Sequence, residues 1–284
     1  MARCLIAGCG YVGEALGARL TSEGHTVFGL RRRMLRPPPG IVPVEADLAV
    51  PASLAALPDA LDYVFYLASP GGAEDALYRS AYVDGQRHLY AALARSGQRP
   101  RRVLFASSTA VYGQRDGEWL TEDSPTRPAD FRGRRLLEAE ALLADTAFIP
   151  GIAVRFGGIY GPRRSSLIDS VRAGRAVIRP GVHFTNRIHR DDCVGALRHL
   201  MQLDAPEPLY LGVDCEPADE AAVLRWLAGV LGAPEPRAAG KHLPPRSERR
   251  ASKRCRNDRL LASGYRFSYP SFRDGYRAIL AEPA

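Results

Sequence analysis

Three glycines near the amino terminus have the spacing of a phosphate-binding turn. They form G-x-G-x-x-G in IAGCGYVGEALG, after the apolar run Cys4–Ala7 and at the start of an amphipathic stretch. There, the first glycine permits a tight turn, the second lets backbone approach a pyrophosphate, and the third lets helix and strand pack closely. A tight turn without a ligand is the alternative. The pattern predicts a dinucleotide site made by Gly8, Gly10, Tyr11, Val12 and Gly13.

The next strand-like run indicates which dinucleotide would bind. Thr26–Leu30 leads directly into Arg31-Arg32-Arg33, with no acidic residue where an NAD site holds the ribose 2′-hydroxyl. Guanidinium groups suit a 2′-phosphate instead. We therefore predict that Arg31 and Arg32 favour NADP(H), while NAD(H) stays possible. From the ends of the following strands, we expect Asp47 and Leu48 to border the adenine, and Leu67, Ala68 and Ser69 to lie beside the pyrophosphate.

Other candidate groups follow two later strand-like runs, Val103–Ala106 and Ile152–Phe156. Ligands bind at the carboxyl ends of parallel strands, and glycines there let backbone approach a ring. A histidine titrates near neutral pH, and arginine suits an anionic group. The candidates are Ser107, Gly157, Gly158 and Ile159 for the cofactor, Thr109, Arg132 and Arg163 for the substrate, and Tyr160 and His189 for proton transfer.

The elements that position these residues alternate between short apolar runs and amphipathic stretches. Runs that are apolar almost throughout are typical of parallel strands buried on both faces, which predicts an α/β fold with a doubly wound sheet. Helices are expected at Ala73–Ser96 and Arg134–Ala144. After residue 157 the pattern loosens, so we expect a nucleotide-binding domain over 1–157 and a smaller lobe over 158–284, interleaved across a soft boundary. Expected in the second half are helices Ser165–Ala173, Asp191–Gln202 and Ala218–Leu231, a strand near Leu209–Val213, a short helix at about Asn257–Ala262, and a C-terminal helix that ends near Leu280.

Composition excludes several classes of protein. The 284 residues are 46% hydrophobic and 25% charged, which is typical of a folded chain. No stretch approaches the roughly 18 apolar residues of a membrane helix, and no cleavage site follows the first apolar run. We expect a cytoplasmic protein. The five cysteines have neither CxxC nor zinc spacing, so we expect buried thiols and no metal site.

Nearly all the excess positive charge lies in one segment. Lys and Arg number 39 against 31 Asp and Glu, a net charge of +8. Residues 237–259 hold nine Lys or Arg and two acidic residues, and 9 − 2 gives +7. A solvated surface or a rim attracting an anionic substrate or the cofactor's phosphates would explain this charge. Nucleic acid is disfavoured because the segment has no aromatic residues for base stacking.

Four motifs in order resemble the short-chain dehydrogenase/reductase superfamily, and more narrowly its extended, NAD-dependent epimerase/dehydratase branch. They are the glycine loop, FASSTAVYG (105–113), RFGGIYGP (155–162) and RIHRDDCVGAL (187–197). The resemblance implies a Rossmann fold with a smaller C-terminal α/β substrate lobe, a small-molecule substrate and a homodimer. It also implies that Ser108 hydrogen-bonds the reacting oxygen, and that a Tyr with a Lys four residues later transfers the proton.

That Tyr and Lys are absent from the expected stretch, 128–140. Aligning on Gly133 and Glu140 puts Arg132 and Leu136 at the two positions, and a shift by one puts Phe131 and Arg135 there. Arginine stays protonated and phenylalanine has no proton to move. The departure, together with GxGxxG in place of GxxGxxG, resembles atypical short-chain dehydrogenase/reductases, in particular the bacterial YeeZ-like group.

Three functions remain open from the sequence. The first is an NADP(H)-dependent oxidoreductase that acts on a small carbonyl or alcohol substrate, anionic if the candidate arginines bind it. Ser108 would polarise the substrate oxygen, and the proton would come from water, Tyr160, His189 or another residue. In this superfamily the His-x-x-Asp of such a segment usually braces the C-terminal lobe. The alternatives are a non-catalytic NADP(H)-binding redox sensor or scaffold, and a sugar-nucleotide epimerase or dehydratase.

Overall fold

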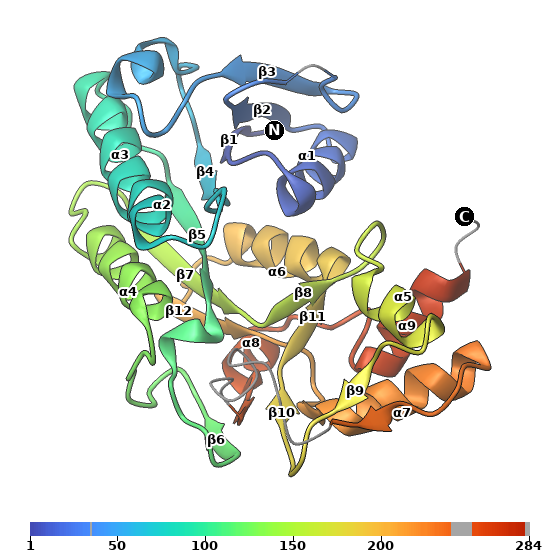
Figure 1. Cartoon of the computed structure of the whole chain (residues 1–284). Helices are drawn as coiled ribbons and strands as arrows, with labels where there is room; N and C mark the ends of the chain where they lie inside the picture. Colours follow the sequence, from blue (N-terminus) through green and yellow to red (C-terminus); the bar gives the residue numbers. More distant parts are fainter. Residues whose placement is uncertain (35, 240–251, 282–284) are drawn as a thin grey trace. The chain divides into compact units, whose positions relative to one another are not determined.

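The computed structural model describes residues 1–34, 36–239 and 252–281 (Figure 1). Its residues group into two compact units that interleave along the chain. Unit 1 comprises Met1–Val111, Pro128–Arg155 and Cys193–Tyr210, and unit 2 comprises Tyr112–Arg127, Phe156–Asp192 and Leu211–Ala284. Four basic residues of the 237–259 segment, Lys241, Arg246, Arg249 and Arg250, lie outside the described residues.

A seven-stranded sheet organises unit 1. Its order is β12-β7-β5-β4-β1-β2-β3, so successive strands are added toward one edge up to β3 and toward the other edge from β4 onward. The pairs β1–β2, β2–β3, β1–β4 and β4–β5 are parallel. The bounds are β1 Arg3–Ala7, β2 Thr26–Arg31, β3 Ile41–Glu45, β4 Tyr63–Tyr66, β5 Arg102–Ser108, β7 Gly151–Phe156 and β12 Leu209–Gly212. The predicted doubly wound sheet is confirmed.

The interior strands are apolar because both of their faces are covered. Leu5 and Ile6 of β1, Phe65 of β4 and Phe105 of β5 have no exposed surface. Crossovers between parallel strands are right-handed, so a reversal of strand order places helices on both faces. The helices are α1 Tyr11–Ser22, α2 Asp75–Tyr78, α3 Gly85–Arg95, α4 Phe131–Ala144 and α6 Arg190–Gln202, with 3-10 turns at Pro51–Ala56 and Thr109–Val111.

The single helix expected over 73–96 is divided in the structure. A π-helical stretch, Arg79–Asp84, separates α2 from α3. The cause is Tyr66, whose hydroxyl donates a 2.5 Å hydrogen bond to the Ala81 carbonyl. A Cβ at Gly85 would overlap the same hydroxyl, so the helix widens around it and continues at a glycine.

In its described residues, unit 2 contains short strands in pairs and the helices α5 Ser166–Arg172, α7 Glu220–Leu231, α8 Asp258–Ala262 and α9 Phe272–Ala281. The parallel pairs are β8 Gly158–Tyr160 with β11 Arg187–His189, β9 Val177–Ile178 with β14 Arg237–Ala238, and β6 Glu118–Leu120 with β15 Lys253–Cys255. β10 Phe184–Thr185 and β13 Ala218–Asp219 are antiparallel. The buried core includes Val171, Val223, Leu227 and Phe272. Among the described residues, no helix has the length and apolar character needed to cross a membrane.

Candidate active site

Each of the three loop positions, 8, 10 and 13, requires or accommodates a glycine for a different structural reason. Gly8 has φ +90°, and a Cβ there would overlap the backbone of Ala68 just after β4. A Cβ on Gly13 would lie 2.9 Å from Cγ2 of Ile6, so this glycine brings α1 onto β1. At Gly10 the nearest atom to such a Cβ is 4.0 Å away, the carbonyl oxygen of Gly8. The protein's own packing therefore leaves space beside Gly10, which fits close approach by a phosphate group.

The same loop opens the amino terminus of α1, which attracts anions. Gly10 is the N-cap and supplies no side-chain hydrogen bond, while Tyr11 and Val12 begin the helix. Cys9, between the glycines, is buried, and burial is the main cause that raises the pKa of its thiol to about 11. Cys9 is therefore a packing residue at neutral pH.

β2 ends beside this loop in arginines, as the sequence predicts. Arg31 pairs with Glu14 of the first turn of α1, with 3.0 Å between Nη1 and Oε1. The side chain of Arg31 is 44% exposed, and Arg32 and Arg33 are also exposed. The ion pair holds the Arg31 guanidinium group next to the glycine loop, and the exposed part of this side chain faces solvent.

The other predicted cofactor residues of unit 1 follow strands β3 and β4. Leu67 donates its backbone N–H to the Ala7 carbonyl (2.8 Å), which holds the segment Leu67–Ser69 beside the glycine loop. After β3, the Asp47 carboxylate accepts from the Ala49 N–H (2.9 Å), and the Leu48 carbonyl lies 2.8 Å from the His88 ring. These strand ends are fixed turns at the carboxyl edge of the sheet.

The two serines that end β5 have different environments. Ser107 is buried, and its hydroxyl donates a 2.5 Å hydrogen bond to Glu140. Glu140 in turn forms an ion pair with the buried Arg155, 2.7 Å between Oε2 and Nη2. The Ser108 hydroxyl is half-buried and accepts from the Ala110 N–H at 3.2 Å. Accepting that bond leaves the Ser108 hydroxyl proton able to point at a ligand, whereas Ser107 is engaged in the scaffold. Thr109, which follows, is buried.

Helix α4 carries the positions where the resemblance expects Tyr and Lys. Leu136 is 2% exposed and packs in the core of unit 1. Arg132, in the first turn, pairs with Asp130, 3.1 Å between Nη1 and Oδ2. A Cβ on Gly133 would overlap the Ala110 carbonyl, so this turn of α4 packs onto the residues that follow Ser108. Helix α4 therefore carries neither a Tyr nor a Lys, and the residues at the two expected positions pack or form ion pairs instead.

In unit 2, Tyr160 and His189 pair across β8 and β11. Tyr160 is buried, and burial is the main cause that raises the pKa of its phenol. His189 is 1% exposed, and burial lowers its pKa to about 4. Both therefore stay neutral around pH 7. Their proposed proton transfer stays a prediction, and it would require a ligand to change these environments.

Asp192 acts as a brace for the C-terminal part of unit 2. Its fully buried carboxylate accepts hydrogen bonds from the Tyr265 hydroxyl (2.8 Å) and from the backbone N–H groups of Ser268 (2.8 Å) and Tyr269 (2.9 Å). The His-x-x-Asp segment therefore has the bracing role that the resemblance implies, through its aspartate.

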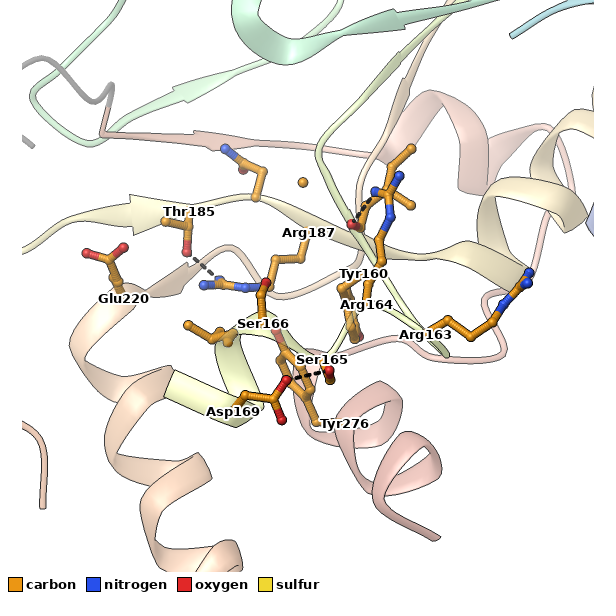
Figure 2. A pocket seen from close by; sticks show the side chains of 14 residues that line it. Tyr160, Arg163, Arg164, Ser165, Ser166, Asp169, Thr185, Arg187, Glu220 and Tyr276 are labelled. Atoms are coloured by element: carbon orange, nitrogen blue, oxygen red, sulfur yellow. Dashed lines mark hydrogen bonds between the residues drawn. The ribbon is translucent and has the colours of Figure 1, made fainter. Parts of the chain in front are cut away.

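A cavity of about 820 Å³ opens in unit 2, and its lining contains three arginines and two carboxylates (Figure 2). Its lining includes Arg163, Arg164 and Arg187. The two lining carboxylates have arginines outside the cavity lining as partners: Asp169 lies 3.6 Å from Arg172, and Glu220 lies 2.7 Å from Arg179. The remaining lining residues are Gly158, Ile159, Tyr160, Ser165, Ser166, Leu167, Thr185, Asn186 and Tyr276.

Backbone geometry shapes this cavity. Arg163 has φ +65°, a left-handed conformation that is uncommon for a residue other than glycine and recurs at ligand sites. A Cβ on Gly157 would lie 2.9 Å from the Asn186 carbonyl oxygen, which explains the glycine between β7 and β8. Arg187 donates to the Thr185 hydroxyl across the cavity wall (Figure 2).

Comparison with known proteins identifies the family. The model of the NAD dependent epimerase/dehydratase family matches residues 4–208. The chain belongs to this family. Among its relatives, a Streptomyces 3-diazoavenalumate denitrifying reductase is 30% identical over 96% of this chain and 98% of its own length. Protein YeeZ of Escherichia coli K12 is 31% identical over 83% and 86%.

A solved structure resembles this epimerase/dehydratase family member over nearly its whole length. A Methylobacillus flagellatus protein, described as of the NAD-dependent epimerase/dehydratase kind, is 38% identical with a TM-score of 0.83, covering 99% of this chain and 98% of that one. The predicted membership of the extended short-chain family, close to YeeZ, is confirmed.

Sequence reasoning located the glycine loop between β1 and α1 but missed part of the cavity. Arg164, Arg187 and Glu220 lie far apart in sequence, and only the fold of unit 2 brings them together. Arg164 could have been found from its place beside Arg163 after a strand end. Within the described ranges, no cluster of three or more His, Cys, Asp or Glu could hold a metal ion.

Proposed function

We propose that this protein is an NADP(H)-dependent oxidoreductase that acts on a small anionic carbonyl or alcohol substrate. The observation that carries the cofactor part is the loop around Gly10, where a phosphate fits and where β2 delivers exposed arginines instead of a carboxylate. The family name adds that a nicotinamide cofactor is usual among its members. When bound, that cofactor supplies or accepts the hydride.

The cavity of unit 2 supports an anionic substrate. Three guanidinium groups line it against two carboxylates, and each carboxylate is already near an arginine outside the lining. A volume of about 820 Å³ is within the usual range for small-molecule sites. Arginine binds carboxylate or phosphate in a bidentate way, so the lining favours such a group over a neutral one.

Within unit 1, Ser108 is the group suited to polarise a substrate oxygen. It ends β5 at the carboxyl edge, is half-buried, and its hydroxyl accepts one backbone hydrogen bond while its proton can still donate. A donor aimed at an oxygen that gains negative charge lowers the barrier to hydride transfer. Ser107 cannot share this role because Glu140 holds its hydroxyl.

A thermal-shift titration with NADP+, NADPH, NAD+ and NADH tests the cofactor part. A ligand specific to the folded state stabilises it by about 2.7 kcal/mol at a hundredfold excess over its Kd. We expect a rise in Tm with the phosphorylated pair that is larger than with NAD(H), and loss of the difference in an Arg31→Ala/Arg32→Ala variant. Arg36→Ala, also exposed but beyond this turn, is the matched control. Equal shifts with all four nucleotides would remove the NADP preference, and no shift would remove the oxidoreductase.

A redox sensor or scaffold is the second candidate, favoured by the buried Leu136 at the position of the family's lysine. A panel of 2-keto acids and their methyl esters separates the two, with NADPH oxidation followed at 340 nm. The enzyme is expected to reduce acids faster than esters and to lose this rate in Ser108→Ala. Tight cofactor binding without turnover of any carbonyl would favour the sensor.

A further inference from the structure

The proposed reaction needs a proton donor, and α4 does not supply one. Seven tyrosines belong to unit 1: Tyr11, Tyr63, Tyr66, Tyr78, Tyr82, Tyr90 and Tyr210. Three of them are buried with engaged hydroxyls. Tyr66 donates to Ala81, Tyr90 donates to Gln86, and Tyr210 accepts from the Glu207 N–H.

Position and environment separate the other four tyrosines. Tyr63 begins β4 and so lies at the amino edge of the sheet, away from the ligand side. Tyr82 lies one turn further along the chain, where its ring packs on Phe105 inside β5 with centroids 6.2 Å apart, and burial there raises the pKa of its phenol to about 12. Tyr11 belongs to the glycine loop, where phosphates are expected rather than the reacting ring. Tyr78 remains, and it is half-buried.

Chain topology places Tyr78 at the carboxyl edge of the sheet. α2 follows the carboxyl end of β4, and the chain then runs back through α3 to the start of β5. Tyr82, one turn further from that edge, packs on Phe105 of β5 with ring centroids 6.2 Å apart. Phe105 precedes Ser108 by three residues, about 10 Å along a strand. Relative to Tyr82, Tyr78 therefore lies closer to the carboxyl edge of the sheet, just as Ser108 lies closer to that edge than Phe105 does.

Two contacts fasten Tyr78 to the first turn of α4. Its ring meets Phe131 edge to face, with centroids 5.5 Å apart and an interplanar angle of 88°. The guanidinium carbon of Arg132 lies 5.9 Å from the centroid of the Tyr78 ring. This turn of α4 is the one whose Gly133 packs on Ala110, two residues after Ser108.

A bidentate ion pair holds the two helices in this arrangement. Nε and Nη2 of Arg135 bind Oδ1 and Oδ2 of Asp75 at 2.8 and 2.9 Å. Hydrogen bonding to Arg135 is the main cause that lowers the pKa of Asp75, so the carboxylate stays ionised at neutral pH. Phe131 and Arg135, which occupy the Tyr and Lys positions in one alignment, thus contact Tyr78 and Asp75 of α2.

We propose that Tyr78 is the proton donor of the reduction, with Arg132 beside its ring, and that it replaces the tyrosine absent from α4. The inference rests on the proposed function. The carbonyl carbon accepts a hydride from a reduced nicotinamide, and the C=O π pair moves to the oxygen, which hydrogen-bonds Ser108. That oxygen takes the proton from the Tyr78 hydroxyl and becomes an alcohol. The phenolate is reprotonated by water.

Removing the hydroxyl alone tests the role in catalysis. Tyr78→Phe keeps the ring contacts, so we expect an unchanged Tm and an unchanged thermal shift with NADPH. With the best carbonyl of the keto-acid panel, kcat should fall about 100-fold or more, in the range typical of a lost general acid. Tyr82→Phe, the same change one turn away, should stay within twofold of wild type. A Tyr78→Phe variant within twofold of wild type overturns the proposal.

Nitration with tetranitromethane provides a readout independent of turnover. We expect mass spectrometry to find Tyr78 nitrated in the protein alone, and at least fivefold more slowly with saturating NADP+, because the nicotinamide would lie beside the ring. Tyr66 and Tyr90 should stay unmodified in both states. Tyr78 that is not nitrated, or is nitrated equally fast with NADP+ bound, contradicts the proposal even if no carbonyl of the panel reacts. A wild-type protein without any thermal response to nicotinamide nucleotides instead overturns the proposed function, and this inference with it.

Discussion

Alanine at Gly10 and alanine at Gly8 should have opposite effects on folding and binding. At Gly10 the new Cβ would have no neighbour closer than 4.0 Å, so the fold should tolerate it. At Gly8 the residue must adopt φ +90° and its Cβ would overlap the backbone of Ala68. Left-handed backbone costs about 1–3 kcal/mol and overpacking about 1–3 kcal/mol, so Gly8→Ala should lose about 2–6 kcal/mol of stability.

Binding of NADPH, in contrast, should be weakened by alanine at Gly10. A methyl group at Gly10 occupies the space beside the loop where a phosphate would approach, and overpacking by about 1–3 kcal/mol weakens Kd up to about 100-fold. At an NADPH concentration 100 times the wild-type Kd, wild type gains about 2.7 kcal/mol, whereas a 100-fold weaker variant gains about 0.4 kcal/mol. At roughly 2 °C per kcal/mol, a shift of about 5 °C should shrink to about 1 °C.

Differential scanning fluorimetry with and without NADPH measures both effects. We expect Gly10→Ala to have the Tm of wild type and almost no NADPH shift, and Gly8→Ala to have a Tm lower by about 4–12 °C. Gly24→Ala, also at positive φ but with nothing within 4 Å, separates backbone strain from overlap. A Gly10→Ala variant with the full NADPH shift would refute the assignment of the loop to a phosphate site.

Three further outcomes follow from buried or cavity-lining charges. Glu140→Gln should cost about 3–5 kcal/mol in denaturant unfolding because the buried charge of Arg155 loses the Glu140 carboxylate, whereas replacing both by leucine should cost less. His189, with its pKa lowered from 6.5 to about 4, is neutral when folded and gains a proton on unfolding, so stability should fall by up to about 3 kcal/mol from pH 6.5 to 4, a slope that His189→Gln should lack. Arg187→Gln should raise KM for keto acids about tenfold and leave KM for their esters unchanged, while Arg172→Gln, outside the cavity lining, should change neither.

The sequence predicted unit 1 well because its strands are physically distinctive. Runs such as Cys4–Ala7 and Val103–Ala106 are apolar on both faces, and a parallel sheet between two helical layers is the fold that buries them. The one helix whose interruption was missed depends on Tyr66, whose hydroxyl reaches the Ala81 carbonyl from a neighbouring strand. No local pattern in 73–96 encodes that contact.

Unit 2 was predicted less fully for the same physical reason. Its strands β9, β10, β13 and β14 have two residues each, too short to show a period of two. Their pairing is set by tertiary contacts, and the cavity lining comes from elements far apart in the sequence, among them β8, β11, α5 and α9. The sequence identified Arg163 as a substrate candidate from its place after a strand, while Arg187 became a candidate only when β11 was paired with β8.

The two faces of α4 explain how a chain could keep this fold while losing the Tyr–Lys pair. Gly133 and Glu140 still perform the packing tasks of the helix, against Ala110 and in the Ser107–Arg155 network. Positions 132 and 135 face α2 instead and have ion-pair partners there or nearby, so their change cost the scaffold little. Because Ser108 remains half-buried with its proton able to donate, the oxygen-binding part of the site does not depend on which helix delivers the proton. If the proposed reaction holds, we therefore expect hydride transfer and proton delivery to be separable in this fold, with the phenol of Tyr78 on α2 supplying the proton.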